Sequence, residues 1–320
     1  MKRLRVVYFG TPAFSAHFLQ KCALELSDRI EIVTVVTQPD KPVGRKQILT
    51  ATPVSDIANQ HNIPVYKKTL KQNTEIIDIL TGLKPDMALV FAYGEIISGE
   101  LLHVPSRGFW NLHPSLLPLY RGASPVAYPL ILGDRETGVT LMKMDEKMDH
   151  GPTIAQTKAP ISPDELRPDL TVRLTGLAFY LFKTNLENTM ESSYKEQLHT
   201  EATVTKLFTK DDGYISFQYI SAALNNGDSQ ELPHILRRYI EKYSKTVTHS
   251  PAEVIFNLYR GLYDWPGIWT KVNINGEEKR LKITKCSLQN QILAIERVQL
   301  EGKNEIDFRT FQKAYNVFSL

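Results

Sequence analysis

The residues best suited to chemistry lie between positions 111 and 149. Asn111 and His113 close an apolar stretch with one residue between them, and Asp149 follows the histidine by 36 residues. An amide can donate hydrogen bonds to a developing oxyanion, an imidazole can carry a proton, and a carboxylate can orient and charge the imidazole. These three groups are what an acyl or formyl transfer without a metal requires.

The spacing of the amide and the imidazole strengthens this interpretation. A lone histidine at a strand end is more often structural than catalytic, but residues i and i+2 of an extended chain project from one face. Asn111 and His113 can therefore address the same substrate atom. His150 is a competing base, which we rank below His113 because it neighbours Asp149 and should point elsewhere.

The carboxylate belongs to a polar loop, where a plainer explanation is available. Gly151-Pro152 favours a turn directly after Asp149. Taken singly, Asp145 and Asp149 could each be a solvated turn residue. Asp149 is a candidate because of its combination with Asn111 and His113.

The segments that must position these residues alternate between apolar strands and helical patterns across residues 1–205. Gly10 closes the first strand, Thr11 can cap a helix, and Pro12 suits its first turn. The alternation predicts an α/β fold, with a Rossmann-like parallel sheet and crossover helices. Strands are predicted at 5–9, 30–36, 87–91, 109–112 and 139–142, and a long helix at 170–191.

In such a sheet, binding residues lie at the carboxyl ends of the strands. Tyr93, Gly94, Asn111 and His113 all fall at or just past predicted strand ends. The sheet therefore brings these two pairs toward one edge.

The pattern changes after a polar linker near 192–205. Asn275-Gly276 between two alternating runs is a strong hairpin signal. Further strands are predicted at 292–300 and 305–308, and helices at 233–243 and 251–262. Residues 206–320 therefore read as a small β-rich, barrel-like domain.

Composition excludes several classes of protein. A chain of 320 residues favours two domains, and no apolar run approaches the ~20 residues of a membrane span. The N-terminus lacks the features of a signal peptide, and two distant cysteines, Cys22 and Cys286, suggest a reducing compartment, which we take as the cytoplasm. Gly10 stands alone where a dinucleotide site shows three glycines, no Walker A motif is present, and no cluster has zinc spacing.

Two features leave a choice between a plain surface and contact with nucleic acid. Residues 1–205 carry 22 basic and 22 acidic side chains, whereas residues 206–320 carry 16 and 13, so the net charge of +3 lies in the second part. The segment 37–46 holds two prolines, a glycine and the basic residues Lys41, Arg45 and Lys46. It is either a surface loop or a loop that contacts an anion.

For Trp265 and Trp269, core packing is the default interpretation and base stacking the weaker one.

Taken together, these motifs resemble the folate-dependent formyltransferase superfamily, and within it the methionyl-tRNA formyltransferases. Asn111-Leu112-His113, the Ser-Leu-Leu-Pro run at 115–118 and the distant Asp149 match the superfamily hallmark. Three further segments match the narrower family: 9–14, 37–45, and the C-terminal pieces 264–269 and 299–303.

The resemblance implies a Rossmann-like catalytic domain at 1–205 and an OB-like tRNA-binding β-barrel domain at 206–320. It implies transfer of the formyl group of 10-formyltetrahydrofolate to the free α-amine of methionyl-initiator tRNA. The product is N-formylmethionyl-tRNA for translation initiation. Apart from the resemblance, we take a monomer as the default and expect no metal. By the same resemblance, the catalytic residues are Asn111, His113 and Asp149, the folate-binding residues are Ser115, Leu116, Leu117, Pro118, Phe91, Tyr93 and Gly94, and the tRNA-binding residues are Lys41, Arg45 and Lys46.

The sequence departs from the family pattern at three places. The loop after Arg45 is less basic than related loops, and Lys147 stands at a position that is commonly glycine. Residues 217–249 look like a helical insertion, which is either a decorative amphipathic helix or an extra tRNA contact. The insertion carries His234, Arg237, Arg238, Lys242 and Lys245.

Two other functions use the same residues differently. A sugar-amine formyltransferase would apply the same three groups to a nucleotide-linked amino sugar, but the 38–45 loop and the β-rich tail disfavour it. A folate-binding or tRNA-binding module without catalysis is disfavoured by the intact Asn111, His113 and Asp149.

Overall fold

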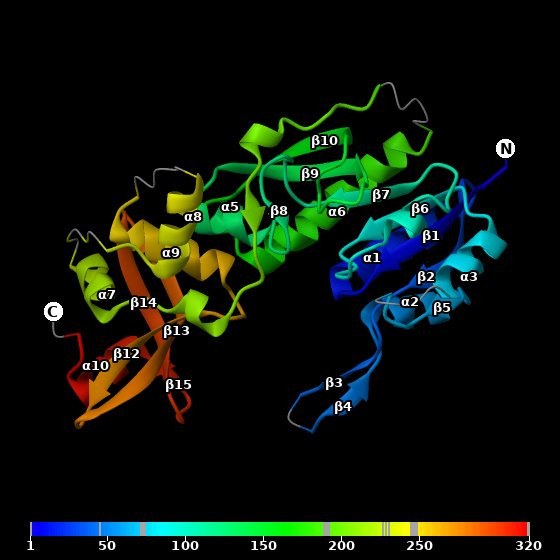
Figure 1. The fold of residues 1–320 in the computed structure, drawn as a ribbon. Coiled ribbons are helices and arrows are strands. Elements are labelled where there is room, and N and C mark those ends of the chain that lie inside the picture. Colours follow the sequence, from blue (N-terminus) through cyan, green and yellow to red (C-terminus); the bar gives the residue numbers. More distant parts are fainter. Residues whose placement is uncertain are drawn as a thin grey trace. The chain divides into compact units, whose positions relative to one another are not determined.

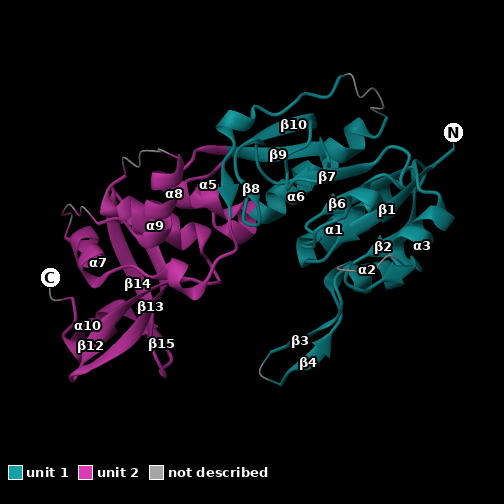
Figure 2. Cartoon of the chain, in the orientation of Figure 1, with its two compact units in different colours: residues 1–125, 137–159, 171–205 teal, residues 126–136, 160–170, 206–320 magenta. Residues whose placement is uncertain are grey.

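A computed structural model describes residues 2–44, 46–70, 75–187, 193–225, 227, 229, 231–243 and 249–318 (Figure 1). Arg45 of the predicted loop and Lys245 of the predicted insertion lie outside the described residues. The chain divides into two compact units (Figure 2). Unit 1 comprises residues 1–125, 137–159 and 171–205, and unit 2 comprises residues 126–136, 160–170 and 206–320.

The described residues of unit 1 build a seven-stranded sheet in the order β10-β9-β7-β6-β1-β2-β5. Its strands are β1 (Leu4–Gly10), β2 (Ile30–Val36), β5 (Val65–Tyr66), β6 (Met87–Phe91), β7 (Phe109–His113), β9 (Glu136–Lys143) and β10 (Thr153–Pro160). β1 pairs in parallel with β2 and β6, and β6 pairs in parallel with β7, as predicted. β9 runs antiparallel to β7. The sequence did not predict this reversal because an apolar run carries no sign of strand direction.

Helices cover both faces of this sheet, which explains why its central strands are continuous apolar runs. On one face, Val7 and Phe9 pack against Leu80 of α3 and against α4. On the other, Tyr8 stacks on Phe18 of α1, which also contacts Phe182 of α6. The helices of unit 1 are α1 (Ala13–Glu25), α2 (Pro53–Gln60), α3 (Glu75–Leu83), α4 (Gly99–Leu102) and α6 (Arg167–Asn185), whose first residues fall in unit 2.

The turn after β1 differs from the prediction in one detail. Pro12 is the N-cap of α1, and no side chain caps this helix. Thr11 instead donates from Oγ1 to the carbonyl oxygen of Tyr93 at 2.8 Å. Because Tyr93 follows β6, this bond ties together the carboxyl ends of two neighbouring strands.

The predicted loop at 37–46 contains a strand of its own. β3 (Lys41–Val43) and β4 (Ile48–Thr50) form an antiparallel hairpin that extends from the sheet of unit 1 (Figure 1). Its strand residues are all exposed. Pro42 and Gly44 give this segment the composition of a loop, so the short strands were not predicted.

Unit 2 contains an antiparallel sheet in the order β12-β13-β14-β15. Its strands are β12 (Ile268–Ile274), β13 (Glu277–Gln289), β14 (Ile292–Leu300) and β15 (Glu305–Asp307). The predicted hairpin is confirmed: Asn275 and Gly276 have φ of 53° and 87°, as a two-residue turn with both centres left-handed requires. The fold class, an α/β domain followed by a small β domain, is therefore confirmed.

The helices of unit 2 are α5 (Ala127–Leu132), α7 (Phe217–Leu224), α8 (His234–Tyr243), α9 (Pro251–Gly261) and α10 (Phe308–Tyr315). α9 forms the centre of this unit, because all of its residues except Glu253 are buried and it packs against β13, β14 and α5. Ser250 and Glu253 form a capping box at its start, and Pro251 occupies its first turn. α7 and α8 occupy the predicted insertion. None of the described helices is long and apolar enough to cross a membrane.

The two tryptophans of unit 2 have different environments. Trp269 is half-buried, contacts Tyr214 and donates from Nε1 to the carbonyl of Lys210 at 2.9 Å. Trp265 is 51% exposed, so the expectation of core packing is wrong for this residue. The reason is local: Asp264 has φ of 74°, and the chain turns at the surface between α9 and β12.

Candidate active site

The predicted Asn111, His113 and Asp149 come together in unit 1. Asn111 and His113 lie on β7, are 9% and 4% exposed, and point to one face. Asp149 follows β9 in the loop that returns toward them. Its Oδ1 accepts from Asn111 Nδ2 at 3.1 Å and lies 3.5 Å from His113 Nδ1. The carboxylate therefore stands against both side chains, as the spacing predicted.

The hydrogen-bond partner of His113 Nε2 determines which ring nitrogen carries a hydrogen. His113 Nε2 lies 2.9 Å from the carbonyl oxygen of Tyr120. A carbonyl oxygen only accepts, so Nε2 carries a hydrogen and donates it. Nδ1, which faces Asp149, is therefore the nitrogen that can exchange a proton during a reaction.

A short parallel pair of strands holds the second oxygen of the carboxylate. β8 (Arg121–Gly122) pairs with β11 (Val204–Thr205), and the Gly122 amide donates to Asp149 Oδ2 at 2.7 Å. Gly122 has φ of 101°, and a Cβ there would lie 2.6 Å from the Thr205 carbonyl oxygen. Tyr120 and Asp149 also have positive φ, 62° and 50°, so this site holds unusual backbone conformations in non-glycine residues.

The Ser-Leu-Leu-Pro run at 115–118 forms the turn that leads from β7 to β8. Ser115 is fully buried, and its hydroxyl donates to the Leu119 carbonyl at 2.6 Å. The Leu117 amide donates to Thr140 Oγ1 at 3.1 Å, and the Leu117–Pro118 bond is cis. Leu116 and Pro118 are half-buried. The Ser115 side chain therefore serves the turn itself.

Phe91, Tyr93 and Gly94 lie at the end of β6. The rings of Phe91 and Tyr93 are 1% and 2% exposed and pack in the core. Burial is also the main cause that raises the pKa of Tyr93 above its ordinary value. These residues therefore offer a ligand mainly their backbone. Gly94, at φ of 85°, leaves room for Gln38, whose Nε2 would lie 2.7 Å from a Cβ there.

The candidate tRNA-binding residues belong to the β3–β4 hairpin. Lys46 is exposed in its turn, and Arg45 lies outside the described residues. Lys41 donates from Nζ to Gln38 Oε1 at 2.6 Å, and Gln38 donates from Nε2 to the Tyr93 carbonyl at 3.1 Å. The base of the hairpin is thus tied to the segment that follows β6.

Gln197 is a residue of this site that the sequence analysis missed. Its Nε2 donates to the carbonyl oxygens of Asp149 and Gly151, at 3.0 and 2.7 Å. Its Oε1 accepts from Nε and Nη2 of the buried Arg121, at 3.1 and 2.7 Å. Gln197 lies within the polar linker and belongs to no motif, so only its position in the fold reveals this role.

His150, the competing base, contacts Asp145 and stacks on His199. Its Nδ1 lies 2.6 Å from Asp145 Oδ2, while Asp145 Oδ1 accepts from the Lys147 amide at 2.9 Å. Asp145 is thus a turn residue, as its plainer interpretation held, and Lys147 is accommodated in that turn. Among the described residues, no group of three or more His, Cys, Asp or Glu is arranged to hold a metal ion.

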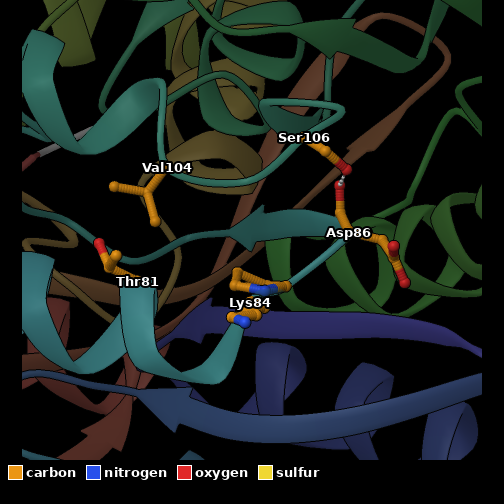
Figure 3. Close-up of a pocket in the computed structure, with 6 residues that line it drawn as sticks. Thr81, Lys84, Asp86, Val104 and Ser106 are labelled. Atoms are coloured by element: carbon orange, nitrogen blue, oxygen red, sulfur yellow. Dashed lines mark hydrogen bonds between the residues drawn. The ribbon is translucent and has the colours of Figure 1, made fainter.

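A separate depression lies at the opposite edge of the sheet. It is lined by Thr81, Lys84, Asp86, Val104 and Ser106, and the Ser106 hydroxyl donates to the Asp86 carbonyl at 3.2 Å (Figure 3). Asp86 directly precedes β6, so this depression is at the amino end of the strand. The candidate site is at the carboxyl ends, where open α/β sheets bind ligands.

The chain matches the models of a known family. A family model described as formyl transferase matches residues 2–182, and one described as formyl transferase, C-terminal domain, matches residues 247–292. Because the first match spans more than half of the chain, the chain belongs to the formyl transferase family.

Relatives within this family carry a more specific name. A methionyl-tRNA formyltransferase from Dictyoglomus thermophilum is 33% identical over 323 residues, which cover 98% of each chain. One from Roseiflexus sp. is 41% identical over 216 residues, which cover 67% of this chain and 66% of that relative. The resemblance to methionyl-tRNA formyltransferases that the sequence indicated is confirmed by these relatives.

A solved structure shares the fold. A sugar 3N-formyl transferase, described in the presence of dTDP and 5-N-formyl-THF, aligns with a TM-score of 0.56 over 91% of this chain and 88% of that chain. The two sequences are 20% identical, so the likeness concerns the fold alone.

Proposed function

We propose that this chain transfers the formyl group of 10-formyltetrahydrofolate to the α-amine of methionyl-initiator tRNA. The product is N-formylmethionyl-tRNA for translation initiation. One observation carries the proposal: Asn111, His113 and Asp149 converge at the carboxyl end of β7. The relatives named methionyl-tRNA formyltransferase support this choice of substrate.

Asn111 has the donor that the reaction needs. A primary amide carries two N–H groups, and Asp149 accepts only one of them. The second can donate to the formyl oxygen as negative charge develops there. A preformed donor of this kind in a largely buried site is typically worth about 10²–10³ in rate.

We assign His113 and Asp149 to the transfer of the proton that the amine loses. The amine nitrogen forms a bond to the formyl carbon of 10-formyltetrahydrofolate and loses a proton. The bond from that carbon to N10 breaks, and N10 takes up a proton, so the folate leaves as tetrahydrofolate. Because Nε2 of His113 is committed to Tyr120, the proton moves through Nδ1 or through the Asp149 carboxylate beside it.

We assign the folate donor to the part of unit 1 that borders this trio. We assign its site to the ends of β6 and β7, with Gly94 and the turn at 115–118. Phe91, Tyr93 and Ser115 would contribute backbone groups, because their side chains are buried. Leu116 and Pro118 would contribute apolar surface.

The acceptor requires a second surface. We assign it to the β3–β4 hairpin through Lys41, Arg45 and Lys46, and to residues 206–320 as a tRNA-binding domain. The hairpin presents exposed side chains, and residues 206–320 hold the whole excess of positive charge. Lysine and arginine at such positions bind the phosphate backbone.

A direct assay tests the proposal. The purified chain is incubated with 10-formyltetrahydrofolate and either methionyl-initiator tRNA or a nucleotide-linked amino sugar. Formylation of the tRNA alone is expected. Formylation of the sugar alone would retain the three catalytic groups but remove the tRNA assignment. Transfer to neither acceptor would remove the proposed function.

A further inference from the structure

A cluster of titratable side chains lies beside Asp149 but outside the trio. The rings of His150 and His199 stack in parallel, with centroids 4.0 Å apart and an angle of 7° between their planes. His150 contacts Asp145 on one side, and His199 contacts Arg121 on the other. All four residues belong to unit 1.

The partners of the two rings determine where hydrogens can reside. Arg121 Nη2 lies 2.9 Å from His199 Nδ1, and a guanidinium only donates. His199 Nδ1 must therefore be an unprotonated acceptor, which makes the ring neutral with its hydrogen on Nε2. His150 Nδ1 faces the Asp145 carboxylate and donates to it.

Arg121 connects this neutral ring to the loop of Asp149. Its Nη2 donates to both His199 Nδ1 and Gln197 Oε1. Gln197 uses both amide hydrogens on the carbonyls of Asp149 and Gly151. The main chain of Arg121 continues into Gly122, whose amide holds the Asp149 carboxylate. Arg121 thus reaches the carboxylate by two routes.

We propose that His199 is a positioning residue for the formyl transfer. Its unprotonated Nδ1 fixes Arg121, which in turn fixes Gln197 and the Asp149 loop. The inference rests on the proposed function for its effect on catalysis, but the link from His199 to Asp149 is a property of the structure alone.

The charges around His199 favour its neutral form near pH 7. The groups that face it are His150, Arg121, Lys147 and Glu196, with Asp145 beyond His150. Desolvation by the surrounding protein, the stacked His150 and the Arg121 guanidinium lower the pKa of His199 below its ordinary value of about 6.5. As the pH falls through that lowered pKa, the proton enters Nδ1, and an N–H group then opposes the arginine.

Two substitutions separate the acceptor from the ring. His199→Asn places an amide oxygen near the position of Nδ1 and cannot gain a charge, whereas His199→Phe keeps a ring for stacking and removes the acceptor. At pH 7.5 we expect kcat/KM within about threefold of wild type for H199N and roughly tenfold lower for H199F, since one hydrogen bond is worth about a factor of ten. His17→Asn on the exposed surface of α1 is the matched control.

The decisive readout is the ratio of wild-type to H199N kcat/KM between pH 7.5 and 5.5. Titration of the substrate amine affects both enzymes equally and cancels in this ratio. We expect the ratio to fall as the pH falls toward 5.5, because only the wild type protonates at position 199. The ratio of wild type to H17N should stay constant. A constant ratio for H199N would overturn the inference.

A second readout does not need activity. The Gly122 amide donates to Asp149, so its hydrogen-exchange protection, corrected for intrinsic exchange, reports the placement of that carboxylate. We expect protection to fall between pH 7.5 and 5.5 in the wild type and to persist in H199N. Identical behaviour of the two proteins would refute the link. Absence of formyl transfer with this difference intact would count against the proposed function only.

Discussion

His113, which we assign to proton transfer, has one ring nitrogen available for the reaction. His113 Nε2 is held by the Tyr120 carbonyl, and Nδ1 faces Asp149. Asn111 is restricted in a similar way, since one of its two N–H groups is given to the same carboxylate. Each side chain therefore keeps one group for the reaction, and neither can rotate without losing a buried partner, which is costly.

Removing the amide should damage catalysis selectively. We expect Asn111→Ala to lower kcat by about 10²–10³, because the donor to the formyl oxygen is lost. The dissociation constant for methionyl-tRNA should stay within about twofold of wild type. Single-turnover formylation and a filter-binding assay measure the two quantities. Asn59→Ala on the exposed surface of α2 is the control, and full activity in N111A would exclude the assigned role.

Removing the charge of Asp149 should also lower kcat, but through the loss of proton transfer. Asp149→Asn preserves the shape of the side chain, but an amide nitrogen would then face a donor from Asn111 or Gly122. We expect kcat to fall by at least about 10², since proton transfer loses its carboxylate. Steady-state kinetics at saturating donor measures this, and an unchanged kcat would show that Asp149 takes no part in proton movement.

The sequence predicted the trio but not its supports. Asn111 and His113 are close in sequence, and their i, i+2 spacing has a direct geometric meaning. Gln197 is 48 residues from Asp149, to which it donates. Nothing in its sequence neighbourhood distinguishes it from other polar linker residues. Its role follows from chain folding, which brings β11 beside β8.

At the scale of elements, the strand ends form one connected edge. Thr11 after β1 and Gln38 after β2 both donate to the Tyr93 carbonyl after β6. Lys41, at the start of the hairpin, donates to Gln38. The hairpin assigned to the acceptor is therefore joined by hydrogen bonds to the segment assigned to the folate donor.

Substitution of Gly94 should disturb this edge. Gly94→Ala would bring a methyl group to 2.7 Å from Gln38 Nε2 and would strain a backbone at φ of 85°. We expect a loss of about 1 kcal/mol or more in the free energy of unfolding, together with a higher KM for the folate donor. Urea unfolding and initial-rate kinetics measure these effects. Gly82→Ala, where a Cβ meets nothing within 4 Å, is the matched control.

The hairpin itself should affect the acceptor more than the reaction. We expect Lys46→Ala to weaken tRNA binding and to reduce the slope of log K against log salt concentration by roughly one. Because Lys46 is distant in sequence from the trio and exposed, kcat at saturating tRNA should be unchanged. Lys21→Ala on α1 is the control. A pure loss of kcat in K46A would contradict the assignment.

The central strands could be predicted because their residues are apolar and β-branched, and β2 and β6 have the predicted bounds. The direction of β9 and the short strands β3 and β4 could not. Pairing direction depends on which neighbour a strand meets, and a three-residue strand with a proline leaves no periodic pattern.

At the scale of the whole molecule, the excess of basic over acidic side chains lies in residues 206–320, which carry 16 and 13. α8 shows how this charge is arranged: Ile235, Leu236 and Tyr239 are buried, and Arg237, Arg238 and Lys242 are exposed. The helix is amphipathic, as predicted. Its exposed basic side chains give residues 206–320 a surface suited to a polyanion.

Neutralising this surface tests whether it contacts tRNA. We expect the combined variant Arg237→Gln, Arg238→Gln and Lys242→Gln to bind tRNA more weakly and with a smaller salt slope, with kcat unchanged at saturation. The exposed positions should leave the free energy of unfolding within about 0.5 kcal/mol. Equal affinity and slope in the variant and the wild type would make the helix a structural insertion only.

The hydrogen bonds that Gly122 and Gln197 donate to Asp149 have a consequence for synthesis of the chain on the ribosome. The residues that complete this arrangement, Gln197 and the strand Val204–Thr205, follow the sheet in sequence. They also lie beyond residue 182, where the match to the first family model ends. A nascent chain can therefore assemble its sheet before Gln197 and β11 are available to hold the Asp149 loop. The Asp149 site should be complete only once residue 205 has emerged, a few seconds after the last strand of the sheet at about 5–20 residues per second.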